Sequence, residues 1–398
     1  MQELFFEMNP WWQGKFELKS IFRTKYISLF DFNLSNKDVI LITGLRRVGK
    51  STLMKQMIYH LIYDKNINPK HICYLSIDAM SFKSYLIYEL VREFRKLCNL
   101  NIDDKIYLFL DEVTVKDSWS QELKNLYDLE GIKIFASSSS ASKLIDKKAY
   151  LTGRSRTFEI EPLDFNEFLE FKKYTSKNSE RYLLENYFKD YMEFGGIPEY
   201  VLTADPTYII NLVDTIIYRD IVAIYKIKNI EVIKDLFKLL CERVGKQISY
   251  NKLGHILGIS KDTVQRYIGY FKDTYLFCDV EINSKNLNER IKDNKKLYCA
   301  DVGIKNVTTG VRDLGAIYEN LVFLKIKSFK PRYVKDAGIE IDFIYEYPRV
   351  SKEYVLIEAK YGQNLTDEQK KLFDKVKAKH KIVTKDLDFF EDDTFCKK

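Results

Sequence analysis

Residues 39–51 read VILITGLRRVGKS, an apolar run followed by a glycine-containing loop that ends in Lys-Ser. The loop from Gly44 to Ser51 has the form G-x-x-x-x-G-K-[ST], in which backbone N–H groups wrap the phosphates of a nucleotide. The apolar run predicts a buried strand before the loop, and residues 52–58 continue as an amphipathic helix whose N-terminus points at the phosphates. The sequence therefore predicts that the chain binds ATP with Mg²⁺.

Within this loop, Lys50 is expected to reach the β- and γ-phosphates, and Ser51 is expected to offer its hydroxyl to Mg²⁺. The residues assigned to nucleotide binding are Gly44, Arg46, Arg47, Val48, Gly49, Lys50, Ser51, Thr52 and Asp111.

A second motif predicts that the chain also hydrolyses the nucleotide. The apolar run 106–110 ends in Asp111 and Glu112. In P-loop enzymes the first acid holds Mg²⁺, and the second polarises the attacking water. An apolar run followed by two acids is common at strand ends, but its position downstream of a phosphate loop favours the catalytic interpretation. Asp111 is then assigned to the metal together with Ser51. Glu112 is assigned to catalysis together with Lys50.

Three further residues are candidates for catalysis. The run 132–135 leads into Ala-Ser-Ser-Ser-Ser at 136–140, where Ser138 is placed to sense a γ-phosphate if this strand lies beside that of Asp111. A serine-rich turn is the alternative. Arg154 is placed to face a nucleotide of its own or a neighbouring subunit, and Arg219 is a second such arginine or else the partner of Asp220.

The composition limits the class of protein. With 398 residues and 46% hydrophobic content, the chain is expected to fold as at least two domains. The net charge of +7 permits nucleic-acid binding without establishing it. The six cysteines form no C-x-x-C pair, which argues against a zinc site or a disulfide framework. No apolar run approaches the roughly 18–20 residues of a membrane span, so a cytoplasmic protein without a membrane partner is expected.

The order of apolar runs predicts an α/β fold in the first 162 residues. Asn9 to Trp12 are expected to pack on the adenine side of this core. Residues 163–240 show helical periodicity and are expected to form a lid or connector. The strands of the parallel sheet, with helices on both faces, are expected at 39–42, 72–77, 106–110, 132–135 and 156–160.

Residues 241–300 have the pattern of a winged helix-turn-helix. A helix is expected at 250–257, a tight turn at 258–260, and a second helix from 261 with Ser260 as its cap. Winged helices also dock proteins, and Asp262 at the expected phosphate face weakens the case for DNA. If the second helix enters a major groove, the residues that enter it are Lys261, Thr263, Gln265 and Arg266.

Residues 301–398 carry acids and a lysine on two expected strands, 338–344 and 355–360. Alternate residues of a strand share a face, so Glu358 and Lys360 point the same way, next to Asp342 across the hairpin. Glu319, on a preceding helix, is placed to add a ligand. Such a set can bind Mg²⁺ and activate water for phosphodiester cleavage; a solvated hairpin with an ordinary cross-strand ion pair is the alternative.

Taken in order, these motifs resemble the AAA-type ATPases of archaea and bacteria whose ATPase core is followed by a C-terminal domain of unknown function. The resemblance also rests on 118–124, 151–154, 162–165, 193–199, 218–220 and 298–303. It implies a P-loop (AAA+-like) parallel sheet, then a helical lid with a winged helix, then a small α/β restriction-endonuclease-like domain. It also raises the expectation of a nuclease core at Glu319, Asp342, Glu358 and Lys360. Ala136-Ser137 replace the usual Thr-Gly of this family, which leaves the register of the serine sensor open.

Two functions remain open from the sequence. The first is an ATP hydrolase that acts on DNA or is regulated by it, with a possible metal-dependent nuclease-like domain. The second is an ATP-dependent switch that docks a protein partner and binds no nucleic acid. A homo-oligomer is expected if either arginine acts in trans.

Overall fold

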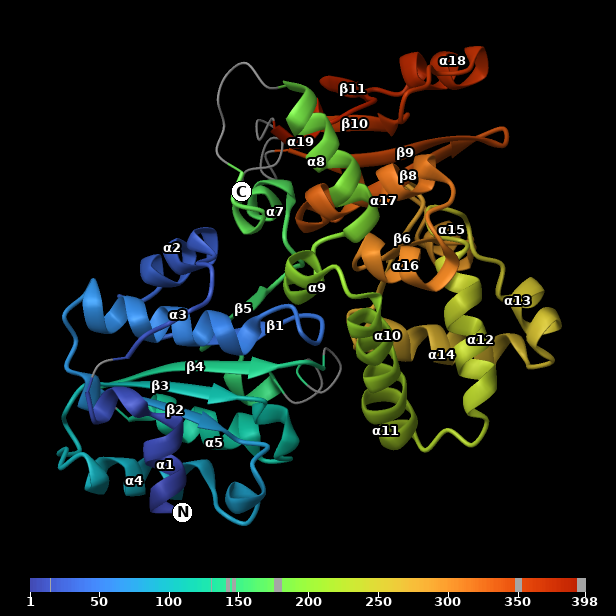
Figure 1. Cartoon of the computed structure of the whole chain (residues 1–398). Coiled ribbons are helices and arrows are strands. Elements are labelled where there is room, and N and C mark those ends of the chain that lie inside the picture. Colours follow the sequence, from blue (N-terminus) through green and yellow to red (C-terminus); the bar gives the residue numbers. More distant parts are fainter. Residues whose placement is uncertain are drawn as a thin grey trace. The chain divides into compact units, whose positions relative to one another are not determined.

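The computed structural model describes residues 1–14, 16–129, 131–140, 144, 148–174, 181–347 and 353–391 (Figure 1). The chain divides into two compact units, Met1–Glu161 and Pro162–Lys398. The finer division of the second unit at residues 240 and 300 stays a prediction.

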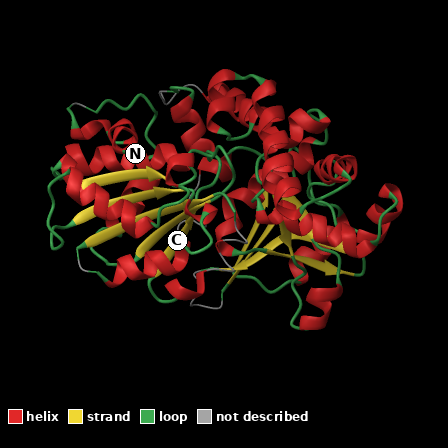
Figure 2. Ribbon diagram, turned by 90° about the horizontal axis from the view of Figure 1, so that it is seen from below, coloured by secondary structure: helices red, strands yellow, loops and turns green. Residues whose placement is uncertain are grey.

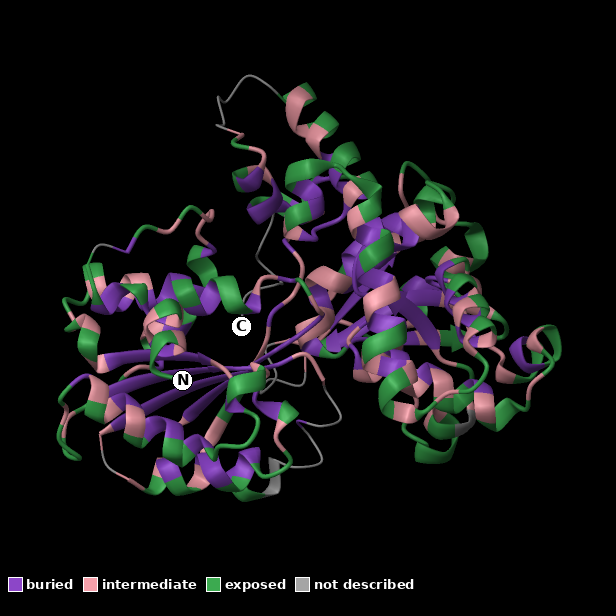
Figure 3. Cartoon of the chain, turned by 60° about the horizontal axis from the view of Figure 1, so that its bottom comes forward, coloured by how far each residue is buried: buried purple, intermediate pink, exposed green. Residues whose placement is uncertain are grey.

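A parallel five-stranded sheet forms the centre of the first unit. Its strands are β1 (Val39–Thr43), β2 (Ile72–Ser76), β3 (Ile106–Asp111), β4 (Ile132–Ser138) and β5 (Ser155–Glu159). They lie in the order β2-β3-β4-β1-β5, and every pair is parallel. The apolar runs become strands because both faces of a parallel sheet are covered, and the central strands are buried (Figure 3). The predicted fold class of this unit is confirmed.

Helices cover both faces of this sheet. Figure 1 shows α2 and α3 on one face and α4 and α5 on the other. The helical segments are α1 (Gln2–Met8), η1 (Pro10–Trp12), α2 (Thr24–Phe32), α3 (Lys50–Tyr63), η2 (Pro69–His71), η3 (Met80–Phe82), α4 (Ile87–Leu97), η4 (Val113–Val115), α5 (Trp119–Asp128) and η5 (Lys148–Leu151).

The N-terminal aromatic segment covers the edge strand β2. The indole N–H groups of Trp11 and Trp12 donate to the Ile72 carbonyl at 3.0 and 2.8 Å. The Asn9 amide accepts from the Tyr74 N–H at 2.6 Å and donates to the Tyr74 carbonyl at 3.0 Å. An edge strand has unpaired backbone groups, and these side chains satisfy them. The expected position on the adenine side was wrong, because β2 lies three strands away from β1 and its phosphate loop.

The second unit begins with helices, as predicted for 163–240. They are α7 (Phe165–Phe171), α8 (Arg181–Phe194), α9 (Pro198–Thr203), α10 (Pro206–Thr215), the π-helical η6 (Ile216–Val222), α11 (Ala223–Tyr225) and α12 (Ile230–Cys241).

A helix-turn-helix follows, with α13 (Tyr250–Leu257) and α14 (Lys261–Asp273) at the predicted positions. Ser260 caps α14 by accepting the Thr263 N–H at 3.1 Å. The antiparallel strands β6 (Phe277–Val280) and β7 (Lys296–Cys299) come next, with α15 (Leu287–Lys292) between them. Gln247, before α13, forms an isolated bridge with Lys296.

The last part of the unit is a four-stranded mixed sheet in the order β11-β10-β9-β8, drawn in yellow with the other strands in Figure 2. The β8–β9 and β9–β10 pairs are antiparallel, and the β10–β11 pair is parallel. The elements are α16 (Val302–Thr309), α17 (Leu314–Ile326), η7 (Lys327–Phe329), β8 (Arg332–Asp336), β9 (Ile339–Glu346), β10 (Tyr354–Ala359), α18 (Asp367–Lys375), β11 (His380–Thr384) and α19 (Asp388–Glu391).

Glycines and a buried aspartate join the two segments 193–199 and 298–303. The Asp301 carboxylate accepts the N–H groups of Gly196 at 2.6 Å and Ile304 at 3.2 Å. A Cβ at Gly196 would collide with the Leu163 carbonyl, and one at Gly303 would collide with the Phe194 carbonyl. Burial raises the pKa of Asp301 to about 6. Close backbone packing therefore accounts for these two motifs.

Five cysteines, Cys73, Cys98, Cys241, Cys278 and Cys299, are unbridged, and Cys396 lies outside the described residues. Among the helices of the described residues, none has the length and apolar character needed to cross a membrane.

Candidate functional site

The residues predicted to bind the nucleotide meet where the strands of the parallel sheet end, at their carboxyl ends. The phosphate loop follows β1, Asp111 and Glu112 end β3, and the serine run ends β4. Carboxyl ends of parallel strands share an edge, and ligands of open α/β sheets bind there. The sheet order places β4 between β1 and β3, so the serine run lies between the loop and the two acids.

The loop conformation requires its glycines. Gly44 has a φ of +135°, and a Cβ there would collide with the Ile160 carbonyl; Gly49 has a φ of +99°. These backbone conformations are unfavourable for residues with a side chain. Helix α3 begins at Lys50, directly after the loop, so its N-terminal N–H groups face the position predicted for the phosphates.

Lys50 is folded over the loop that precedes it. Its Nζ donates to the carbonyls of Gly44 and Leu45, both at 3.0 Å, and the residue is buried. The ammonium group thus lies inside the loop that is expected to wrap a phosphate.

Arg23, which the sequence interpretation missed, hydrogen-bonds the backbone of the same loop. Its guanidinium donates to the carbonyls of Val48 at 3.2 Å and Glu161 at 3.0 Å. Its backbone N–H donates to Gln56 of α3 at 3.1 Å. No motif marks Arg23 in the sequence, because only the fold brings residue 23 to residue 48.

Tyr74 lies beside both residues that are predicted to hold Mg²⁺. Its hydroxyl donates to Asp111 Oδ2 at 2.7 Å and lies near the Ser51 hydroxyl. Burial and the neighbouring Asp111 charge raise the pKa of Tyr74 well above its ordinary value, so the hydroxyl keeps its proton. Asp111 and Ser51 therefore lie close to one another, which fits the donor set expected for Mg²⁺ bound with a triphosphate.

Glu112 has a backbone conformation that residues with a side chain adopt rarely, with φ 53° and ψ 45°. Its N–H donates to the Ser137 hydroxyl at 3.0 Å, and its carboxylate accepts from the Ser139 hydroxyl at 3.2 Å. Left-handed residues other than glycine cluster at functional sites, where the surrounding structure holds them. The serine run thus orients the predicted base.

Ser137, and not the predicted sensor Ser138, contacts the acids of the site, and the sensor role itself stays a prediction. The Ser137 hydroxyl hydrogen-bonds Asp111 Oδ1, whereas the Ser138 hydroxyl contacts Thr114 Oγ1 at 2.8 Å. Successive side chains of a strand point to opposite faces, so only one of two adjacent serines shares a face with Asp111.

Arg154 lies at the opposite end of the sheet from the phosphate loop. It precedes β5, and the register pairs Val39 at the start of β1 with Ser155. Five residues of strand separate that end from the loop by about 16 Å. Its guanidinium lies over the Tyr127 ring at 5.8 Å and is 3.7 Å from Asp128. The option that Arg154 contacts the nucleotide of its own chain was therefore wrong; contact in trans stays a prediction. Arg219 is exposed on η6 of the second unit, and its role stays a prediction.

In the helix-turn-helix, the predicted DNA residues are not equivalent. Lys261, Gln265 and Arg266 are exposed on α14. Thr263 is half-buried, and its hydroxyl contacts Ser260 at 2.9 Å and Arg266 at 3.4 Å. Thr263 therefore contributes to the helix cap.

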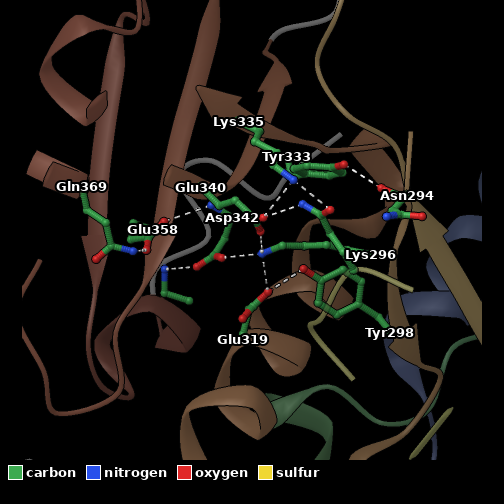
Figure 4. Close-up of polar contacts among 12 residues, drawn as sticks. Asn294, Lys296, Tyr298, Glu319, Tyr333, Lys335, Glu340, Asp342, Glu358 and Gln369 are labelled. Atoms are coloured by element: carbon green, nitrogen blue, oxygen red, sulfur yellow. Dashed lines mark hydrogen bonds and ion pairs between the residues drawn. The ribbon is translucent and has the colours of Figure 1, made fainter. Parts of the chain in front are cut away.

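A second cluster of charged residues lines a cavity of about 350 Å³ in the second unit, which we call the acidic pocket. Glu319 of α17, Asp342 of β9, Glu358 of β10 and Lys360 all line it, as predicted. Figure 4 labels the three acids among them. The sequence interpretation missed Lys296 of β7. Its Nζ lies 2.8 Å from Asp342 Oδ1, 3.2 Å from Glu319 Oε1 and 3.8 Å from Glu340 Oε2.

Hydrogen bonds hold the acids of this pocket in place. Glu358 accepts the Asp342 N–H at 2.9 Å and the Gln369 side-chain amide at 2.9 Å, and Lys360 Nζ lies 3.2 Å from it. The Ala359 N–H donates to Asp342 at 3.0 Å. Burial and the Asp342 charge raise the pKa of Glu358 to about 8 and that of Glu319 to about 7. Burial opposes the charge of Lys296, but Asp342 and Glu319 raise its pKa well above its ordinary value.

The predicted Mg²⁺ site in the acidic pocket does not fit this arrangement. The ammonium of Lys296 lies between the carboxylates that would be the metal ligands (Figure 4). No group of three or more His, Cys, Asp or Glu side chains in the described ranges is arranged to hold a metal ion. The four predicted residues come together, and the ammonium of Lys296 contacts two of them, Glu319 and Asp342.

Two models of known protein families match parts of the chain. A family model described as "AAA domain" matches residues 36–169, and one described as "Domain of unknown function (DUF8612)" matches residues 185–315.

Two solved structures with similarity are the Aeropyrum pernix ORC1 protein in complex with DNA and AMPPCP-bound DnaA from Aquifex aeolicus. The first is 11% identical with a TM-score of 0.33, covering 73% of this chain and 93% of that chain. The second is 19% identical with a TM-score of 0.29, covering 63% and 87%.

Similarity to curated proteins extends over most of the chain. "Uncharacterized protein MJ1637" of Methanocaldococcus jannaschii is 27% identical over 392 residues, which cover 88% of this chain and 81% of that protein. "Uncharacterized protein MJ1544" of the same organism is 31% identical over 379 residues, which cover 90% of this chain and 81% of that protein. The chain therefore belongs to the family of MJ1544, and its first unit is an AAA-type P-loop ATPase domain.

Proposed function

We propose that the chain hydrolyses Mg-ATP at the edge formed by β1, β3 and β4, and that DNA regulates this hydrolysis. The observation that supports hydrolysis is the meeting of Lys50, Ser51, Asp111 and Glu112 at that edge, with Tyr74 contacting both Ser51 and Asp111.

In this proposal Lys50 binds the β- and γ-phosphates, and Ser51 and Asp111 hold the metal ion. Bound Mg²⁺ neutralises charge that develops on the transferred phosphoryl group. Glu112 orients and deprotonates the attacking water, and the Ser139 hydroxyl, 3.2 Å from its carboxylate, fixes its direction. Ser137 holds both Asp111 and the Glu112 backbone in register.

Support for DNA comes from the second unit. The order α12, Gln247 bridge, α13, α14, β6, β7 is the order of elements in a winged helix. In helix-turn-helix proteins the second helix enters the major groove with its N-terminal residues first. Lys261, Gln265 and Arg266 are exposed at that end of α14 and are suited to contact phosphates and bases.

A protein partner is the second candidate, for a specific reason. Ile256 on α13 is 56% exposed, and the acidic Asp262 lies next to Lys261 at the exposed start of α14. An apolar side chain and an acid on this surface are better suited to a protein than to a phosphate backbone. In this alternative ATP controls docking, and no nucleic acid is bound.

The test of hydrolysis is steady-state ATP turnover by the full chain and two variants. Lys50→Ala should abolish turnover. Glu112→Gln should keep nucleotide binding, measured by calorimetry, and lower turnover by about 10²-fold or more, because a general base is lost. Undiminished turnover in Lys50→Ala would remove the assignment of the site.

The test of DNA is turnover with and without duplex or single-stranded DNA at about 50 and about 200 mM salt. DNA should stimulate wild-type turnover more at the lower salt. Removing Lys261 or Arg266 should reduce the salt slope of DNA affinity by about 1 each, if each contacts one phosphate. The control is Lys238→Ala, an exposed lysine of α12 that pairs with Asp235. No retention of DNA at the lower salt would reject the first candidate in favour of the protein partner.

A further inference from the structure

We infer that the ammonium of Lys296 takes the place of a cation between Glu319 and Asp342 and so keeps divalent cations out of the acidic pocket. The inference goes beyond the proposed ATP hydrolysis and does not depend on it.

The first argument is the position of the Lys296 ammonium. It lies 2.8 Å from Asp342 and 3.2 Å from Glu319, and its side chain is only 4% exposed. A divalent cation needs the same carboxylate oxygens at about 2.0–2.6 Å. A metal ion bound there would lie within a few ångströms of the ammonium in a buried site, where like charges repel strongly. The two cations therefore exclude one another.

The second argument is the balance of charge. The pocket is lined by five acidic side chains, Asp313, Glu319, Glu340, Asp342 and Glu358. Asp313 is paired with Lys246 at 3.1 Å, and Glu358 is paired with Lys360 at 3.2 Å. Lys296 contacts the other three acids, Glu319, Glu340 and Asp342. Glu340 also has Lys335 at 3.7 Å, so Glu319 and Asp342 depend most on Lys296. Removing one partner from a buried ion-pair network leaves uncompensated charge, which protons or another cation must then balance.

The third argument is the structural element that carries Lys296. Lys296 belongs to β7, the strand that pairs with β6 after the helix-turn-helix, whereas Asp342 and Glu358 belong to the four-stranded sheet. Tyr298, two residues further on the same face of β7, donates to Glu319 at 2.6 Å. Lys296 thus reaches the pocket from a different supersecondary element, and Tyr298 of the same strand holds the Glu319 carboxylate.

The experiment compares Mn²⁺ binding by the metal-stripped, nucleotide-free full chain and by four variants: Lys296→Gln, Lys295→Gln, Asp342→Asn, and Lys296→Gln with Asp342→Asn. Lys295→Gln is the matched control, because Lys295 pairs with Asp279 and Glu281 outside the pocket. Calorimetry measures binding, and thermal unfolding measures the stabilisation that a bound ion confers.

We expect Lys296→Gln to bind Mn²⁺ at least about tenfold more tightly than wild type, which corresponds to about 1.4 kcal/mol. Its unfolding temperature should fall without metal and recover with Mn²⁺. Wild type and Lys295→Gln should show no Mn²⁺ binding that depends on Asp342. The double variant should bind Mn²⁺ no more tightly than wild type.

Two outcomes would overturn the inference: Mn²⁺ binding by wild type that disappears in Asp342→Asn, or Lys296→Gln that folds and binds Mn²⁺ no better than wild type. Wild-type Mn²⁺ binding that disappears in Asp342→Asn overturns the inference even if Lys296→Gln fails to fold. ATP turnover, measured on the same samples, reports on the first unit separately, so failure of the ATPase proposal would be recognised as such.

Discussion

The Asp111 carboxylate has two close hydroxyl partners, Tyr74 on one oxygen and Ser137 on the other. Hydrogen bonds to a charged acceptor contribute about 1.5–3 kcal/mol each. They fix the direction of a side chain that is expected to act on a metal ion. At the scale of single residues, the chemistry of the site therefore depends on hydroxyl groups that no motif singles out.

The adjacent serines of β4 provide a prediction at this scale. Ser137→Ala should lower ATP turnover by about 10–100-fold if the lost hydrogen bond to Asp111 is worth about 1.5–3 kcal/mol in the transition state. Ser138→Ala removes a contact with Thr114 on the other strand face and should change turnover by less than about threefold. Steady-state kinetics measures both. A larger loss in Ser138→Ala would restore Ser138 as the sensor.

Elements of this chain are joined by backbone groups that come very close together. Segment 193–199 meets segment 301–304 through Asp301 and through glycines whose Cβ positions are filled by neighbouring carbonyls. Such contacts tolerate no added methyl group, because overpacking a dense interior costs about 1–3 kcal/mol.

Two glycine substitutions test this packing. Gly196→Ala should lower the free energy of unfolding by about 1–3 kcal/mol or more, since its Cβ would collide with Leu163. Gly269→Ala, inside α14 with nothing within 4 Å of the added Cβ, should raise it by up to about 1 kcal/mol. Urea unfolding of both variants measures the difference. Equal effects of the two substitutions would contradict the close approach at Gly196.

The buried Asp301 predicts a pH dependence. Burial raises its pKa from 3.8 to about 6, so the folded chain binds this proton more tightly than the unfolded chain. The stabilisation is fully present below about pH 4 and is lost as the pH rises through about 6, at a cost of about 3 kcal/mol. Asp301→Asn lacks this titration. The stability advantage of wild type over the variant should therefore shrink between about pH 4 and about pH 7, and an advantage that grows would refute the shift.

At the scale of the whole molecule, the position of Arg154 has a consequence for assembly. It lies at the amino end of β5, opposite the phosphate loop of its own chain. If Arg154 takes part in hydrolysis, it does so at the nucleotide of a neighbouring subunit.

A mixing experiment tests this arrangement. Arg154→Ala and Lys50→Ala should each be nearly inactive, while their mixture should recover part of the turnover. In the mixture, the intact loop of the first variant meets the intact arginine of the second. Wild-type turnover should also rise per chain with protein concentration. Full activity of Arg154→Ala alone would exclude the role, and so would a silent mixture of folded variants.

The sequence by itself determined the elements and the catalytic motifs. Apolar runs specified the strands of the parallel sheet, and local signals such as the Ser260 cap placed α13 and α14, because hydrophobic period and capping act within a few residues. The phosphate loop and Asp111-Glu112 were found because their spacing along the chain reflects the chemistry directly.

Only the tertiary structure decided which partners surround these motifs. Arg23, Tyr74 and Lys296 reach their sites from 25 residues or more away in sequence, and no pattern links them to Val48, Asp111 or Asp342. Strand alternation places Ser137, not Ser138, on the face of Asp111. The direction of the sheet places Arg154 at the end opposite the phosphate loop of its own chain. The physical reason is that charge pairing and hydrogen bonding depend on distances of about 3 Å, which only packing between distant segments sets.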